Sequence, residues 1–176
     1  MEFKKINSTF VTQQYYCVKM IPEFIDDPKL LWPILPPGIW IANMEEIELR
    51  FAINPKRLLL FQGLKKALNN LFGAGCLQVY LDGSYVTAKP LPNDYEVCWR
   101  AEFVDPDKLD YVFFDSSMNQ HNQKKKYKGE FFPDFRTESK SGMPFLEFFQ
   151  HDKTTGLEKG IIGINNYLMG GSENDN

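Results

Sequence analysis

The chain has 176 residues, of which 43% are hydrophobic and 15% aromatic, and its formal net charge is -3. This length predicts about one domain and excludes a long multidomain enzyme. The apolar and aromatic content predicts a real core and excludes a mostly disordered chain. The net negative charge excludes an overall positive field that would attract nucleic acid or anionic membrane.

The distribution of residue types along the chain predicts one domain with less regular ends. Residues 1–30 show no clear period, and their structure is uncertain from sequence. Three prolines and a glycine within 31–40 predict an extended, apolar strap, because proline fixes φ and has no amide proton to donate. We expect the domain to span 31–168, followed by a disordered tail over 169–176.

Two helices are predicted after the strap. Asn43 and Glu46 have the spacing of a capping box, which predicts a short helix over about 44–52. Pro55 suits the first position of the next helix. Apolar residues then recur with a 3.6-residue period over about 56–72. These patterns favour two amphipathic helices in succession.

Strands are predicted in the second half of the chain. Residues 76–81 have the pattern of a buried strand, and residues 95–103 alternate in the manner of a second one. Residues 145–150 are predicted to form a further short helix or strand. Glycines at 156, 160 and 163 are predicted to interrupt the isoleucines near the C-terminus.

The cysteines and the N-terminal residues indicate the cellular compartment in which the protein is expected. Three scattered cysteines are too few for a disulfide framework, which favours a reducing environment; they are Cys17, Cys76 and Cys98. The charged N-terminus is not followed by the apolar stretch of a signal peptide, and no window has the ~20 apolar residues of a membrane span. We therefore expect a cytoplasmic protein without membrane partners.

The residues with the chemistry of a site lie between the first two strands. Gly83-Ser84 follows the first strand, and nine residues, 85–93, separate it from Asp94, which begins the second strand with Glu96. Side chains two apart on a strand share a face, so the two carboxylates lie together while Tyr95 points the other way. Carboxylates at this spacing suit Mg²⁺, and a Gly-Ser turn leaves amides and a hydroxyl to hold phosphate.

This spacing resembles the signature of the polymerase-β-like nucleotidyltransferase superfamily. The matching residues are Gly83-Ser84 and, after nine residues, Asp94-Tyr95-Glu96-Val97. A third acid is expected on a later apolar strand, where Glu130 is the best candidate and Asp115 and Asp110 are alternatives. Residues 33–165 also look like a family of small, largely uncharacterised bacterial nucleotidyltransferase-like proteins.

The resemblance implies a fold and a reaction. The fold is an α/β (α+β) minimal nucleotidyltransferase fold, with a small mixed β-sheet flanked by helices. The reaction moves a nucleoside monophosphate from a nucleoside triphosphate to an acceptor hydroxyl, with two Mg²⁺ ions ~3.5–4 Å apart. Asp94, Glu96 and Glu130 are the implied metal-binding and catalytic residues. Gly83, Ser84 and Lys89 are the implied triphosphate-binding residues.

The acceptor and the activity stay open at this point. The chain lacks the extra domains of larger members, so the acceptor is expected to be a protein or RNA, with no strong indication of DNA binding. The resemblance also implies a toxin-antitoxin or phage-defence context. Because Glu96 and Glu130 carry one methylene more than the usual aspartates, the alternative is a catalytically degenerate module that binds a partner protein or nucleotide without turnover.

Other polar and aromatic residues have ordinary interpretations. The lysine run 124–128 is typical of a solvated surface, although it can also meet phosphates. His121 and His151 lack neighbours at zinc spacing and are expected to be ordinary polar residues. The tryptophans are expected to anchor the core or the strap, and one of them stacks on a nucleobase in the alternative interpretation; they are Trp32, Trp40 and Trp99.

Overall fold

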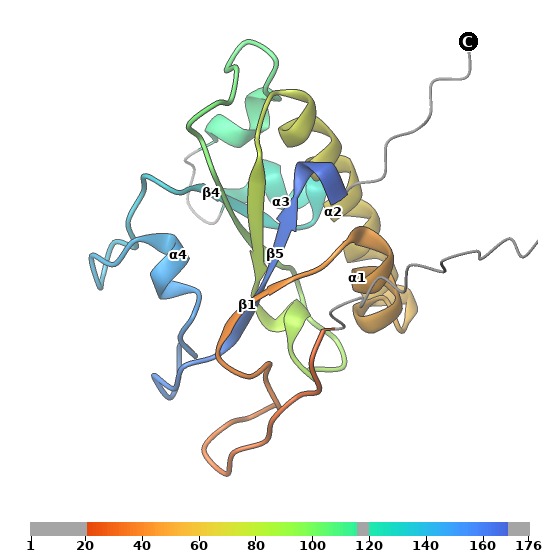
Figure 1. The fold of residues 1–176 in the computed structure, drawn as a ribbon, viewed down its shortest axis with the longest axis vertical. Coiled ribbons are helices and arrows are strands. Elements are labelled where there is room, and N and C mark those ends of the chain that lie inside the picture. Colours follow the sequence, from red (N-terminus) through yellow and green to blue (C-terminus); the bar gives the residue numbers. More distant parts are fainter. Residues whose placement is uncertain (1–20, 116–119, 169–176) are drawn as a thin grey trace, which may run out of the picture.

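The computed structural model describes residues 21–115 and 120–168. Two predicted parts of the chain lie outside the described residues. They are residues 1–20 of the predicted N-terminal segment, which include Cys17, and the predicted tail 169–176. The described part is an α+β structure with a mixed sheet covered by helices, as predicted (Figure 1).

The sheet of the described residues has five strands in the order β1-β5-β2-β3-β4. β1 is parallel to β5 and β3 is parallel to β4, whereas β2 is antiparallel to both β3 and β5. The predicted strap therefore ends in an edge strand, and its three prolines precede that strand, so they remove no hydrogen bond from the sheet. The strands are β1 Gly38–Ile41, β2 Gln78–Asp82, β3 Glu96–Trp99, β4 Glu130–Pro133 and β5 Gly160–Asn165.

The two long helices begin at the predicted caps. In α1, Met44–Phe51, the Asn43 side chain accepts from the Glu46 amide (2.9 Å) and the Glu46 carboxylate accepts from the Asn43 amide (2.8 Å). α2, Pro55–Gly73, starts with the predicted proline. None of the described helices is both long and apolar enough to cross a bilayer. The shorter helices are α3 His121–Tyr127, α4 Phe145–Phe148, and the 3₁₀ helices η1 Ser84–Val86, η2 Tyr111–Phe114 and η4 Asn166–Leu168.

Two strand predictions need correction. The strand expected over 95–103 ends at Trp99, because the chain turns beyond it and the Val104 amide donates to the carbonyl of Ala101 (3.1 Å). The glycines near the C-terminus do not interrupt the isoleucines. A Cβ at Gly160 would lie 2.2 Å from a backbone oxygen, and one at Gly163 2.6 Å from a side-chain carbon, so glycine allows close approach within a continuous β5.

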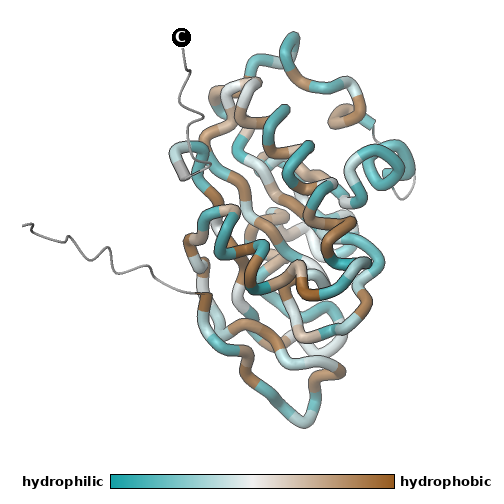
Figure 2. The backbone as a smooth tube through the Cα atoms, turned by 90° about the vertical axis from the view of Figure 1, so that its right-hand side faces the viewer, coloured by the Kyte–Doolittle hydropathy of each residue, from teal (hydrophilic) through white to brown (hydrophobic). Residues whose placement is uncertain are grey.

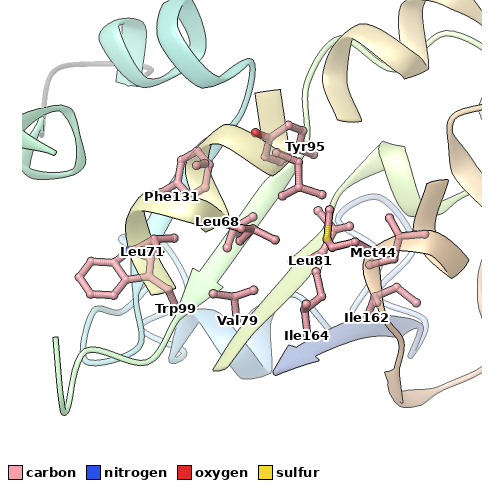
Figure 3. Packing of buried hydrophobic residues seen from close by; sticks show 14 of the residues in the cluster. Met44, Leu68, Leu71, Val79, Leu81, Tyr95, Trp99, Phe131, Ile162 and Ile164 are labelled. Carbon is pink, nitrogen blue, oxygen red and sulfur yellow. The ribbon is translucent and has the colours of Figure 1, made fainter. Parts of the chain in front are cut away.

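The sheet separates two hydrophobic clusters. α1 and α2 cover one face, and Figure 3 shows side chains of α2 and of the strands meeting in this larger cluster. In Figure 2 these helices alternate between hydrophilic and hydrophobic residues, as expected of helices with one buried side. On the opposite face, a smaller cluster includes Tyr80, Cys98 and Phe149 with aromatic rings of α4. Burial raises the pKa of the Cys76 thiol to about 11 and that of Cys98 to about 12, as expected of inert thiols.

Candidate functional site

Three carboxylates lie side by side on the sheet face opposite α1 and α2. Asp82 pairs with Glu96 across β2 and β3, and Glu96 pairs with Glu130 across β3 and β4. Directly paired residues on neighbouring strands point to the same side of a sheet. Asp82, Glu96 and Glu130 therefore form what we call the carboxylate row.

Asp94 precedes β3 and joins the end of this row. The Lys124 ammonium lies 2.9 Å from Asp94 Oδ2 and 2.5 Å from Glu130 Oε1, so the two carboxylates converge on one nitrogen. Tyr95 is buried in the core cluster on the helix-covered side, as the predicted alternation requires. The structure thus brings together the three acids that the sequence singled out, and adds Asp82 to them.

Lysines from a distant loop neutralise the other two members of the row. Lys153 forms an ion pair with Glu96, and Lys159 forms one with Asp82. The second pair is buried, because the side chains of Lys159 and Asp82 are only 8% and 1% exposed. The Lys153 side chain is 55% exposed, so that lysine has room to change partner.

Burial and charge shift the titration of this cluster. Burial raises the pKa of Glu96 above its ordinary value of 4.5, and the nearby Asp82 carboxylate raises it further, while the Lys153 ammonium opposes both. Burial alone would lower the pKa of Lys153, yet its attraction to Glu96 raises it instead. The Glu96 carboxylate is therefore destabilised unless a cation lies beside it.

The Gly83-Ser84 turn lies directly against Glu96. Gly83 has φ +88°, a left-handed conformation that favours glycine, and a Cβ at this position would lie 1.8 Å from Glu96 Oε2. Ser84 then begins η1. The two predicted parts of the site, the turn and the carboxylates, adjoin in the structure.

A buried guanidinium fixes the segment that follows the turn. Arg57 of α2 is 2% exposed and donates to the carbonyls of Tyr85 (2.8 Å), Thr87 (2.8 Å) and Lys89 (2.7 Å). Burial lowers the pKa of this arginine. Because one rigid fork holds three carbonyls, α2 determines the path of the chain next to Ser84.

A cavity of about 520 Å³ opens beside these groups. Predicted site residues that line it are Gly83, Ser84, Lys89, Asp94 and Glu96. Glu130 lies beyond the lining and shares Lys124 with Asp94. The other lining residues include cationic, anionic, polar and apolar side chains: Lys29, Leu31, Trp32, Ile34, Asp82, Thr87, Asp152, Lys153, Thr154 and Lys159.

The carboxylates fit a hard cation only in part. Asp94 and Glu130 hold one ammonium between them, which shows that they can hold a cation from two sides. Among residues 21–115 and 120–168, no group of three or more carboxylate, histidine or cysteine side chains is placed to hold a metal ion. The donors therefore fit Mg²⁺ held by one or two carboxylates and by phosphate oxygens, which is a common arrangement for this ion.

The alternative third acids lie outside the row. The Asp110 carboxylate pairs with Lys126 and accepts from the Tyr127 hydroxyl, and Asp115 lines a separate groove next to η2. Hydrogen bonds from Lys126 and Tyr127 lower the pKa of Asp110 although its partial burial acts in the opposite direction.

Sequence reasoning missed five residues of the site. Asp82 is two residues after Tyr80 in β2, so the two side chains lie on the same face of the sheet, and Asp82 pairs there with Glu96. The alternation along β2 was thus a local signal for Asp82. Lys124 belongs to a lysine run that is typical of a solvated surface, yet its ammonium pairs with Asp94 and Glu130. The contacts of the remaining three join residues far apart in the chain and leave no local signal; these residues are Arg57, Lys153 and Lys159.

Comparison with known proteins identifies a family without an assigned activity. A family model described as a family of unknown function (DUF6932) matches residues 31–165, and the chain therefore belongs to this family. No curated protein and no solved structure matches the chain significantly.

Proposed function

We propose that this DUF6932 member is a Mg²⁺-dependent nucleotidyltransferase that moves a nucleoside monophosphate from a nucleoside triphosphate to an acceptor hydroxyl on a protein or RNA. One observation carries the proposal: Glu96 and Glu130 pair across neighbouring strands, with Asp94 beside them and the Gly83-Ser84 turn against Glu96. This is the arrangement that the polymerase-β-like signature leads one to expect.

In the proposed reaction, the acceptor hydroxyl releases its proton to solvent as its oxygen forms a bond to the α-phosphorus, and the bond from that phosphorus to the pyrophosphate oxygen breaks. Ser84 and the amides of its turn bind phosphate oxygens, and Lys89 contributes a positive charge from the cavity wall. Asp94 and Glu130, with Glu96 next to them, are the residues that would hold Mg²⁺. When bound, this ion lowers the pKa of the attacking hydroxyl and neutralises charge on the leaving oxygens.

Substrate binding on this proposal exchanges ion-pair partners. Lys124 and Lys153 have side chains that are 35% and 55% exposed, so each can move from a carboxylate to a phosphate. The carboxylates that they leave, above all the destabilised Glu96, then need another cation. The buried pair of Asp82 and Lys159 stays in place and supports the row.

A second candidate function has its own observation. Every carboxylate of the row, and Asp94, already has a lysine partner. A degenerate member of the fold can retain a neutral, lysine-rich cavity that binds a nucleotide or a partner protein without turnover.

Two measurements separate these functions. The first is calorimetric titration with each of the four ribonucleoside triphosphates, with Mg²⁺ and with EDTA. The second follows label from α-labelled and from γ-labelled nucleotide into protein or RNA of a cell extract. We expect Mg²⁺-dependent binding, and incorporation from the α position only, because the γ-phosphate leaves with pyrophosphate.

The combined Asp94→Asn and Glu96→Gln variant should lose transfer by roughly 100-fold or more. The matched control is Asp107→Asn, which removes an exposed carboxylate outside the cavity. Nucleotide binding without incorporation would favour the binding module. If the wild-type protein binds none of the four nucleotides, the transferase and the nucleotide-binding module are both wrong, and the module that binds a partner protein is favoured.

A further inference from the structure

A short arm precedes the sheet and borders the cavity. We define the arm as residues 25–34, which project beyond the end of the sheet (Figure 1). Its two ends pair antiparallel, since Ile25 and Ile34 exchange amide-to-carbonyl hydrogen bonds of 2.8 and 3.0 Å. Within it, the Asp27 side chain accepts from the Lys29 amide (2.8 Å), and its carbonyl accepts from Leu30 (2.9 Å). The arm is therefore a closed, hydrogen-bonded unit.

The arm is attached to the loop that follows the Gly83-Ser84 turn. The carbonyl of Pro33 accepts from the amide of Ala88 (2.9 Å), one residue before Lys89. Because Arg57 fixes the carbonyls on either side of this contact, the arm and the turn are held in one arrangement. Side chains of the arm thereby complete the wall of the cavity.

Trp32 differs from the other two tryptophans. Trp99 is buried in the core, and the Trp40 indole donates to the carbonyl of Pro36 (2.9 Å). Trp32 lines the cavity and is 37% exposed, and its neighbour Leu31 is 84% exposed. Adjoining apolar side chains exposed at a cavity wall form a patch, and such patches are typical of binding surfaces.

The cavity therefore has two chemically distinct walls. Leu31, Trp32 and Ile34 supply an apolar and aromatic wall, all from the arm. Lysines, hydroxyl groups and the lysine-paired carboxylates supply the other wall, among them Ser84, Lys153 and Glu96. A nucleoside triphosphate has the same division into a flat base and a polyanionic chain.

We propose that Trp32 is the base-binding residue of this site, and that the nucleobase stacks on its indole while the triphosphate extends toward Ser84, Lys89 and Lys153. This inference rests on the proposed function, because it deepens the nucleotide site. Stacking uses the π face that every base has, and larger rings stack over more area. The site therefore prefers purine over pyrimidine nucleotides and does not distinguish adenine from guanine by this contact.

The test compares nucleotides with inorganic tripolyphosphate, which has the charge but no base. Affinities for ATP, CTP and tripolyphosphate are measured with Mg²⁺ for the wild type, Trp32→Ala and Trp32→Phe. We expect Trp32→Ala to weaken ATP binding roughly tenfold and to leave tripolyphosphate binding unchanged. Trp32→Phe should retain most of the ATP affinity and lose the quenching of tryptophan fluorescence that ATP causes in the wild type.

The control variant is Tyr111→Ala, which removes an aromatic side chain that is 84% exposed and lines a different groove. It should change none of these affinities. If the wild type binds ATP no more tightly than tripolyphosphate, or if Trp32→Ala leaves ATP binding intact, the role of Trp32 is wrong while the proposed function stands. If neither ligand binds the wild type, the nucleotide site itself is wrong and the inference falls with it.

Discussion

On the sheet face covered by α1 and α2, Val97 and Phe131 are buried among apolar side chains, whereas their chain neighbours Glu96 and Glu130 meet lysines on the opposite face. The same two strands thus contribute to the core and to the carboxylate row. The apolar face depends on many small packing contacts, and the charged end of the other face depends on a few ion pairs. Substitutions on the two faces should therefore differ in their effects on stability, on binding and in their dependence on pH.

The largest effect on stability is expected on the apolar face. Phe131 is 1% exposed and lies 5.0 Å from the Phe113 ring and 5.8 Å from the Tyr95 ring, measured between centroids. Phe131→Ala should lower the free energy of unfolding by about 4 kcal/mol, because it leaves a cavity in the aromatic core. Urea unfolding measures this loss, and Phe135→Ala, at a position that is 73% exposed, is the control. A similar small loss in both variants would contradict the comparison.

A somewhat smaller effect is expected from the buried ion pair. Lys159→Met leaves the Asp82 carboxylate buried without its partner and should lower the free energy of unfolding by about 3 kcal/mol. The double variant Asp82→Asn with Lys159→Met removes the uncompensated charge and should recover part of this loss. Equal stability of the single and double variants in urea would show that the pair does not stabilise the charged face as described.

The smallest effect is expected at Lys153, and it should depend on pH. Lys153→Met removes the cation that opposes the raised pKa of Glu96, so that pKa rises further. A folded-state pKa above the unfolded value gives stability that is present below the unfolded value of Glu96 and is lost as the pH rises through the folded value. The variant should therefore match the wild type near pH 4 and be about 1 kcal/mol less stable near pH 7.

Urea unfolding across this pH range measures the difference at Lys153. Lys153→Arg keeps the positive charge and should show little of the pH dependence. A deficit of Lys153→Met that is constant from pH 4 to pH 8 would mean that Glu96 is not the group involved.

Local patterns predicted much of the fold. The capping residues and the apolar period placed α1 and α2, because caps and amphipathic helices depend on residues within a few positions of one another. The alternation around Glu96 placed it and Cys98 on one face. The same local reasoning failed for β5, where glycines that usually interrupt a strand allow close packing against β1 and the chain before it.

The two helices, the Gly-Ser turn and the spacing of Asp94 and Glu96 follow from the amino-acid sequence alone, since each is set by neighbours along the chain. The rest of the site depends on how the chain folds. The register of three strands aligned Asp82 and Glu130 with Glu96, and loops distant in sequence supplied Lys153 and Lys159. Charges act through space and not along the chain, so these partners become visible only once the sheet brings their residues together.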